Sequence, residues 1–136
     1  MDKKNSSITG FMNGYKAGNL SSLASLFNFK KAEIGSHLDN LFYNFPDDST
    51  TEAKKFYSEI KSLKITLHSG LDSFDTMVSL GESINIMVNT YKSLNNPTKE
   101  IVLPDLKKIA YHFIDLAKRA EDQKVIDVAI KIGEKF

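Results

Sequence analysis

The sequence predicts an all-α protein, a compact bundle of five or six helices. Three observations predict this fold class. Apolar residues recur at spacings of three and four along most of the chain, which is the period of an amphipathic helix. No segment shows the strict apolar–polar alternation of a half-buried strand. Apolar residues make up 41% of the 136 residues, and only three residues are proline, so packed helices can form a core.

The chain divides into an N-terminal arm and one domain. Residues 1–18 are polar and contain Gly10, Gly14 and Gly18. Each glycine inside a helix costs about 1 kcal/mol relative to alanine. We therefore expect a flexible or weakly helical arm over residues 1–18, followed by a single helical domain over residues 19–136.

The first part of the domain carries one long apolar stripe that a lysine interrupts. Asn19, Ser21 or Ser22 can cap its start. Because Lys31 lies in the middle of the stripe, we expect a break near residues 29–31 that separates helices of about 20–29 and 31–45. Pro46 ends the second helix, because a proline disfavours helical geometry in the residue before it. The stripe contains Leu20, Leu23, Phe27, Ile34, Leu38, Leu41, Phe42 and Phe45.

The next helix has a clear start signal. Ser49 and Glu52 have the spacing of a capping box, in which each side chain binds a free backbone N–H of the first turn. The predicted buried stripe consists of Ala53, Phe56, Tyr57, Ile60, Leu63 and Leu67.

A helix over about residues 72–94 is predicted to be the central one, because it is apolar on two sides. Gly81 lies between the two faces, so a neighbouring helix can approach closely there. One face holds Met77, Leu80, Ile84, Met87, Tyr91 and Leu94, and the other holds Leu71, Phe74, Val78 and Val88.

The C-terminal part is predicted to be a helical hairpin. Residues 95–98 read as a loop, and Pro104 suits the first turn of the next helix. The apolar phase shifts at residues 121–123, and a last helix follows with Val125, Val128, Ala129, Ile132 and Phe136 on its apolar face.

This hairpin resembles a single tetratricopeptide-type hairpin. Leu106, Ile109, Ala110 and Phe113 match the first-helix pattern of that family, and Ile126 and Ala129 match second-helix positions. Asp122, however, stands where the family prefers a small residue. A solenoid needs about three repeats to share a core, and the first half shows none. We therefore predict an ordinary hairpin.

Composition and motifs exclude several functional classes. The absence of cysteine excludes disulfides, thiolate nucleophiles and cysteine metal sites. The net charge is only +1, and Arg119 is the only arginine, so we expect no nucleic-acid partner. Phosphate-binding loops and nucleophile elbows are missing, so we expect no enzyme. Abundant Lys, Asn and Ile indicate an AT-rich genome.

Each histidine has a carboxylate one helical turn away, but neither the Glu-x-x-His motif of di-iron bundles nor His-Glu-x-x-His occurs. The sequence therefore assigns no metal ligand and no cofactor. A metal-binding helical bundle remains an alternative, with His37, His68 and His112 as its ligands. The pairs are Glu33 with His37, His68 with Asp72, and His112 with Asp115.

The favoured function is that of a non-enzymatic protein-binding helical module. An immunity or antitoxin-like factor, a secretion chaperone or a small regulator would each have this character. The partner is expected to be another protein or a second copy, as a homodimer, because five or six short helices cannot cover all the apolar surface. The predicted partner-binding residues are Phe11, Met12, Tyr15, Met77, Leu80, Met87 and Tyr91.

Peripheral membrane association through residues 8–29 is the other alternative, because apolar side chains there accompany Lys16 and Lys30. No run approaches the roughly 20 apolar residues that span a bilayer. The first residues lack the apolar segment of a signal peptide, so we expect a cytoplasmic protein.

Overall fold

The computed structural model describes the backbone of residues 14–68 and 73–136, and the side chains of residues 23–68 and 73–136. These residues form five helices and no strand, which confirms the predicted all-α bundle. The helices are α1 (Gly14–Tyr43), α2 (Thr51–His68), α3 (Phe74–Tyr91), α4 (Asn96–Ala120) and α5 (Gln123–Gly133).

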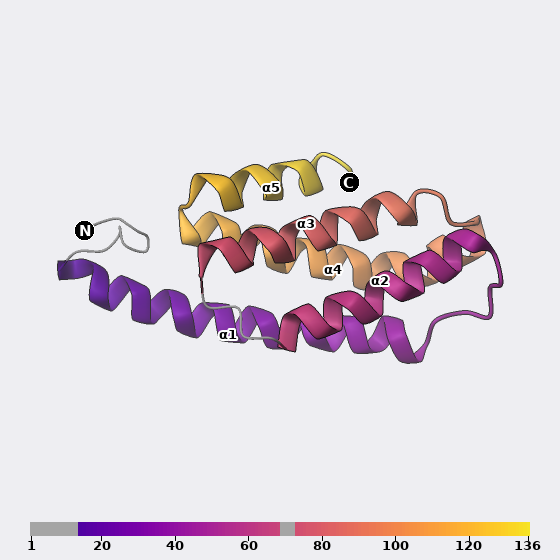
Figure 1. Ribbon diagram of the computed structural model, residues 1–136, viewed down its shortest axis with the longest axis horizontal. Coiled ribbons are helices and arrows are strands. Elements are labelled where there is room, and N and C mark those ends of the chain that lie inside the picture. The colour runs from indigo at the N-terminus through magenta and orange to yellow at the C-terminus, as the bar shows by residue number, and fades with distance from the viewer. Residues whose placement is uncertain (1–13, 69–72) are drawn as a thin grey trace.

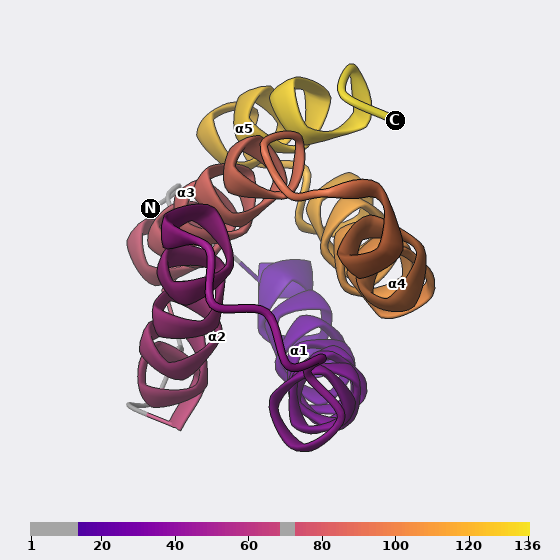
Figure 2. The same ribbon diagram turned by 90° about the vertical axis from the view of Figure 1, so that its right-hand side faces the viewer.

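Consecutive helices run antiparallel, so each pair forms a hairpin (Figure 1). The most extensive contact nevertheless joins α1 to α4, which are distant in the sequence. Viewed along the bundle, α3 lies among α2, α4 and α5 (Figure 2). The predicted central helix and the predicted C-terminal hairpin, α4 with α5, are therefore confirmed.

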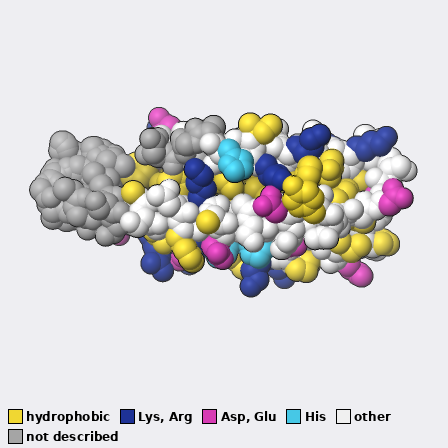
Figure 3. Space-filling model, turned by 90° about the horizontal axis from the view of Figure 1, so that it is seen from below, with side chains coloured by type: hydrophobic (Ala, Val, Ile, Leu, Met, Phe, Trp, Pro, Cys, Tyr) yellow, Lys and Arg dark blue, Asp and Glu magenta, His cyan; other side chains and the backbone are white. Residues whose placement is uncertain are grey.

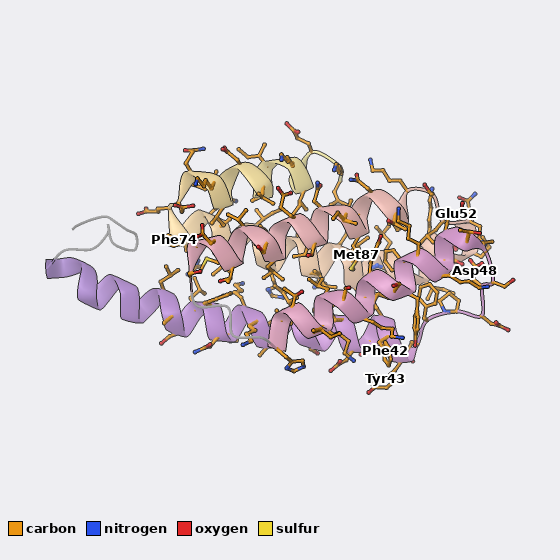
Figure 4. All side chains as sticks on the ribbon, in the orientation of Figure 1. Phe42, Tyr43, Asp48, Glu52, Phe74 and Met87 are labelled. Carbon is orange, nitrogen blue, oxygen red and sulfur yellow. The ribbon has the colours of Figure 1, made fainter. Side chains whose placement is uncertain are left out.

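Helix α3 is buried along most of its length. Leu80, Ile84, Met87 and Val88 have no exposed surface, and Met87 lies inside the bundle in Figure 4. Gly81 is also buried, at the point where α4 and α5 cross α3. A Cβ atom there would overlap the Phe113 ring and lie 2.6 Å from Val128 Cγ1. The close approach that the sequence predicts at Gly81 is therefore present.

The predicted break near residues 29–31 is wrong, because α1 is continuous from Gly14 to Tyr43. The residue that continues the stripe is Lys30, which is only 9% exposed. Its ammonium group lies 2.9 Å from the Asp115 carboxylate on α4. A buried lysine with a charged partner is compatible with an unbroken helix, whereas the prediction treated a cation in the stripe as an interruption.

The start of α2 lies one residue later than predicted. The Thr50 hydroxyl, rather than Ser49, accepts a hydrogen bond from the Ala53 N–H. The buried stripe is confirmed for Ala53, Phe56, Ile60, Leu63 and Leu67, whereas Tyr57, also predicted to be buried, is partly exposed.

Helix α4 begins well before the predicted position. Asn95 caps it by accepting from the Thr98 N–H, and Pro97 occupies the first turn, where a proline removes no helical hydrogen bond. Pro104 lies inside the helix and is exposed. Residues 96–98, predicted as part of a loop, are thus helical, because Pro97 rather than Pro104 is the initiating proline.

The turn between α4 and α5 agrees with the predicted phase shift. Glu121 has a positive φ of 57° and ends α4, and the Asp122 side chain then caps α5 by accepting from the Val125 N–H. This geometry reverses the chain within two residues.

Asp48 connects the α1–α2 segment to the start of α4. Its carboxylate accepts hydrogen bonds from the Thr98 hydroxyl at 2.6 Å, the Asn95 amide at 2.9 Å and the Thr50 N–H at 3.0 Å. These bonds, that of Thr98 first, hold the pKa of Asp48 below its ordinary value of 3.8. A charged acceptor strengthens such bonds, so Asp48 closes this end of the bundle.

We expect Asp48→Asn to lower the free energy of unfolding at neutral pH. The free energy of unfolding of this variant should also depend less on pH in the acidic range. The folded pKa of Asp48 lies below the unfolded one, so its contribution is present above pH 3.8 and is lost as pH falls through the folded pKa. Denaturant unfolding between about pH 7 and pH 2 measures this effect. Asp47→Asn, at an exposed neighbour, is the control and should behave as the wild type. A gap between Asp48→Asn and wild type that is constant over this range would contradict the assignment.

We expect Gly81→Ala to destabilise the protein by about 1–3 kcal/mol, because the added methyl overpacks the core. Gly35→Ala is the matched control, since its Cβ would make an ordinary 3.4 Å contact with Leu67. It should stabilise the protein by up to about 1 kcal/mol. Thermal and denaturant unfolding compare the two variants, and equal effects would disprove the close approach at Gly81.

Candidate functional site

A group of charged and histidine side chains lies in the contact between α1 and α4. We call it the α1–α4 polar cluster. The α1 members are spaced by three and four residues, so they share one face of the helix. The α4 members face them across the contact. The cluster comprises Lys30, Glu33 and His37 from α1 with Asp105, His112 and Asp115 from α4.

Lys30 is the most buried member of the cluster. Its ammonium group lies 2.9 Å from Asp115 Oδ2 and 3.2 Å from His112 Nδ1. An ammonium group can only donate, so His112 Nδ1 is the acceptor in this geometry. The hydrogen bond from Lys30 is the main reason that the pKa of Asp115 lies below its ordinary value.

The two histidines of the cluster stack on each other. Their ring centroids are 5.9 Å apart, with an interplanar angle of 25°. His37 Nδ1 lies 2.9 Å from Asp105 Oδ1, and His112 Nε2 lies 3.7 Å from Glu33 Oε1. Burial, followed by the charge of Lys30, lowers the pKa of His112. Both effects favour the neutral form of His112.

Only two of the three histidines considered from the sequence come together. Glu33, His37 and His112 offer ligand atoms that all lie within 4.8 Å of one another. His68 is exposed at the end of α2 and lines a groove on the other side of α1. Sequence reasoning missed Asp105, which is 68 residues from His37 and becomes its neighbour only through the packing of α4 on α1.

A second surface feature lies where α1 ends beside α2. We call it the aromatic corner, and it consists of Phe42, Tyr43, Phe45 and Tyr57. Phe42 stacks on Tyr57 at 5.2 Å and meets Tyr43 edge-on at 5.0 Å, while Phe45 contacts Tyr57 at 5.5 Å. Tyr43 is nevertheless 75% exposed. Figure 4 shows Phe42 and Tyr43 at the end of α1.

Lysine side chains lie over these rings. The Lys64 ammonium group lies 4.2 Å from the Phe42 ring centre and 5.1 Å from that of Tyr43, and Lys61 lies 5.8 Å from Tyr57. Cations over aromatic faces are attracted by the ring quadrupole. On this side of the molecule, hydrophobic side chains gather next to basic ones (Figure 3).

On the α1–α2 side, described residues line two open cavities. One, of about 480 Å³, lies in the aromatic corner, and Lys54 and Asp48 are among its lining residues. The other, of about 520 Å³, follows α1 past Gly35 and Asp39. The ion pair between Lys64 and Asp39, 3.0 Å long, lies in this second cavity.

The predicted partner-binding residues occupy different environments. Phe11, Met12 and the side chain of Tyr15 lie outside the described residues. Met77, Leu80 and Met87 are at most 3% exposed, so a partner would reach them only if the bundle opened. Tyr91 is partly exposed, with the Lys99 ammonium group 5.8 Å from its ring.

The alternative of membrane association rests on residues 8–29. Within this segment, the structure describes side chains from residue 23 onward. Leu23 and Phe27 face the core, whereas Phe29 is 58% exposed. Among the helices of the described region, none is both long and apolar enough to cross a membrane.

One further acid is partly buried, between α2 and α3. Glu59 accepts a hydrogen bond from the Thr90 hydroxyl through Oε2, while its Oε1 has no partner among the described groups. Burial raises the pKa of Glu59. This carboxyl lines neither of the two cavities, and its hydroxyl neighbour also bonds to the Ile86 carbonyl within α3.

Comparisons with known proteins find no relative of the chain. No protein-family model, no curated protein and no solved structure matches the chain.

We expect Asp115→Asn to destabilise the protein by about 1–3 kcal/mol, because it leaves the Lys30 ammonium group buried without its carboxylate. Lys30→Met should change stability by less than about 1 kcal/mol, since it replaces a buried ion by an apolar chain of similar length and frees a more exposed acid. Arg119→Ala, which removes an exposed partner of Asp115, is the control. Denaturant unfolding measures all three, and a larger loss in Lys30→Met than in Asp115→Asn would reverse the argument.

Proposed function

We propose that the chain is a non-enzymatic protein-binding module whose binding surface is the aromatic corner. The observation that carries this proposal is Tyr43, which is 75% exposed although Phe42 and Lys64 already hold its ring in place. Tyrosine and other aromatic residues at protein surfaces supply most of the energy in many interfaces.

The arrangement of the rings favours binding at a low entropic cost. Phe42 and Tyr57 are stacked, and both contact a further ring of the corner. Side chains that are already ordered lose little rotamer freedom when a partner covers them. The neighbouring cavity of about 480 Å³ provides a concave site for an apolar side chain of that partner.

The charges around the corner favour an acidic partner segment. Asp39 is paired with Lys64. Asp48 keeps its negative charge although Thr98 and Asn95 donate to it, and Asp47 lies beside it in the cavity lining, so an acidic partner residue would lie on the Lys61 side of the corner. Lys54 and Lys61 are exposed and form no ion pair with a described residue. A peptide segment with an aliphatic or aromatic anchor next to Asp or Glu therefore complements this surface.

Several kinds of protein act in this way. An immunity or antitoxin-like factor, a secretion chaperone and a small cytoplasmic regulator all work by covering part of another protein. The proposal requires no cofactor and no bond-making step. A second copy of the chain is the other occupant that the test must separate from an acidic peptide.

We expect the full chain to select peptides of this chemistry from a displayed random library. Tyr43→Ala should weaken the enriched peptides at least about 10-fold, because it removes the most exposed ring. Lys61→Ala should weaken them less and should reduce the salt dependence of binding. Ile130→Ala is the matched control, since Ile130 is a half-exposed apolar residue on α5.

Fluorescence anisotropy with purified peptides measures these affinities. Equal binding by Tyr43→Ala and wild type, or a library without enriched sequences, would refute the aromatic corner as a peptide site. Light scattering tests whether the occupant is a second copy of the chain. If the wild type is a dimer and Tyr43→Ala dissociates it, the aromatic corner is a self-association surface instead.

A further inference from the structure

We propose that Glu33, His37 and His112 bind a divalent transition-metal ion of the Zn²⁺ type. The three residues offer two imidazole nitrogens and one carboxylate oxygen, all within 4.8 Å of one another. Imidazole ligands favour Zn²⁺, Co²⁺, Ni²⁺ or Cu²⁺, whereas Mg²⁺ and Ca²⁺ favour oxygen ligands alone. This inference is independent of the aromatic corner.

The spacing of the ligand atoms suits such an ion. Ordinary bonds from Zn²⁺ to nitrogen and oxygen are about 2.0–2.2 Å long. Glu33 Oε1 and His112 Nε2 are 3.7 Å apart, which is less than the sum of two such bonds. An ion can therefore bridge these two atoms, and a nitrogen of His37 lies within 4.8 Å of both.

His37 is already oriented as a metal ligand. An ionised carboxylate can only accept, so the His37 Nδ1–H donates to Asp105 over 2.9 Å. In the neutral ring this hydrogen bond places the proton on Nδ1, so Nε2 is the nitrogen that can bind a metal ion. Histidine ligands commonly donate their second ring N–H to a carboxylate in this way, which fixes the tautomer and raises the basicity of the free nitrogen.

The site is open to solvent on one side. The side chains of Glu33, His37 and His112 are 42%, 22% and 21% exposed. An ion can therefore enter from water and keep a water molecule as its fourth ligand, as tetrahedral sites with three protein ligands do.

Lys30 is expected to weaken metal binding at His112, and removal of this lysine therefore distinguishes a metal site from an ordinary polar contact. The ammonium group donates to His112 Nδ1, so the ring proton of neutral His112 lies on Nε2, which is the atom that the ion needs. When Zn²⁺ takes Nε2, the proton moves to Nδ1 and the hydrogen bond from Lys30 is lost. Lys30 keeps Asp115 as its partner.

Because α1 supplies two ligands and α4 the third, the ion would cross-link two helices that are distant in the sequence. An ion that binds the folded state alone stabilises it by mass action.

The test measures Zn²⁺ binding by the full chain, purified without a histidine tag, in competition with a chromophoric chelator. We expect one ion per chain and a rise in melting temperature with Zn²⁺. His37→Gln and His112→Gln should abolish both effects, and Asp105→Asn should weaken binding about 10- to 100-fold. His68→Gln is the matched control and should bind as the wild type.

Lys30→Met separates a metal site from an ordinary polar contact, because removal of the lysine should tighten Zn²⁺ binding. Circular dichroism confirms that each variant is folded, and Co²⁺ absorption reports the coordination geometry. The proposal is overturned if wild type does not bind Zn²⁺, if His112→Gln binds as tightly as wild type, if His68→Gln loses the ion, or if Lys30→Met binds more weakly.

Discussion

The ion pair between Lys30 and Asp115 constrains the register in which α1 packs on α4, and the contacts of the α1–α4 polar cluster depend on that register. A buried ammonium group without a carboxylate is costly, so α1 and α4 must pack in a register that keeps these two groups 2.9 Å apart. Successive residues of a helix are rotated by about 100°, so a slip of one residue would move Lys30 away from α4. The same register brings His37 to Asp105 and His112 to Glu33.

The sequence was sufficient for features whose cause is local. The two apolar faces of α3 and the phase shift between α4 and α5 each depend on residues within one helix or one turn. The continuity of α1 was mispredicted because its cause is distant, whereas the early start of α4 was mispredicted although the Asn95 cap and Pro97 are local signals. Lys30 is buried in the apolar stripe with Asp115 of α4 opposite, a partner that is distant in the sequence.

The candidate sites also depend on contacts between helices, which the sequence pattern does not reveal. Periodicity identifies apolar side chains but does not show which of them neighbouring helices cover. Met77 and Met87 were therefore predicted as partner-binding residues although the bundle buries them. The sequence pairs each histidine with a carboxylate one helical turn away. Asp105, the carboxylate that orients His37, comes from another helix instead. The aromatic corner likewise combines the end of α1 with Tyr57 of α2.

Helix α1 carries both proposed sites on different sides. Glu33 and His37 face α4, whereas Gly35, Asp39 and Phe42 line the cavities shared with α2. The Lys30–Asp115 pair opposes a rigid-body shift of α1 against α4. An ion at the polar cluster would therefore act mainly on the stability of the α1–α4 contact. The aromatic corner would keep its shape, so metal binding and partner binding are expected to be separate properties of one rigid helix.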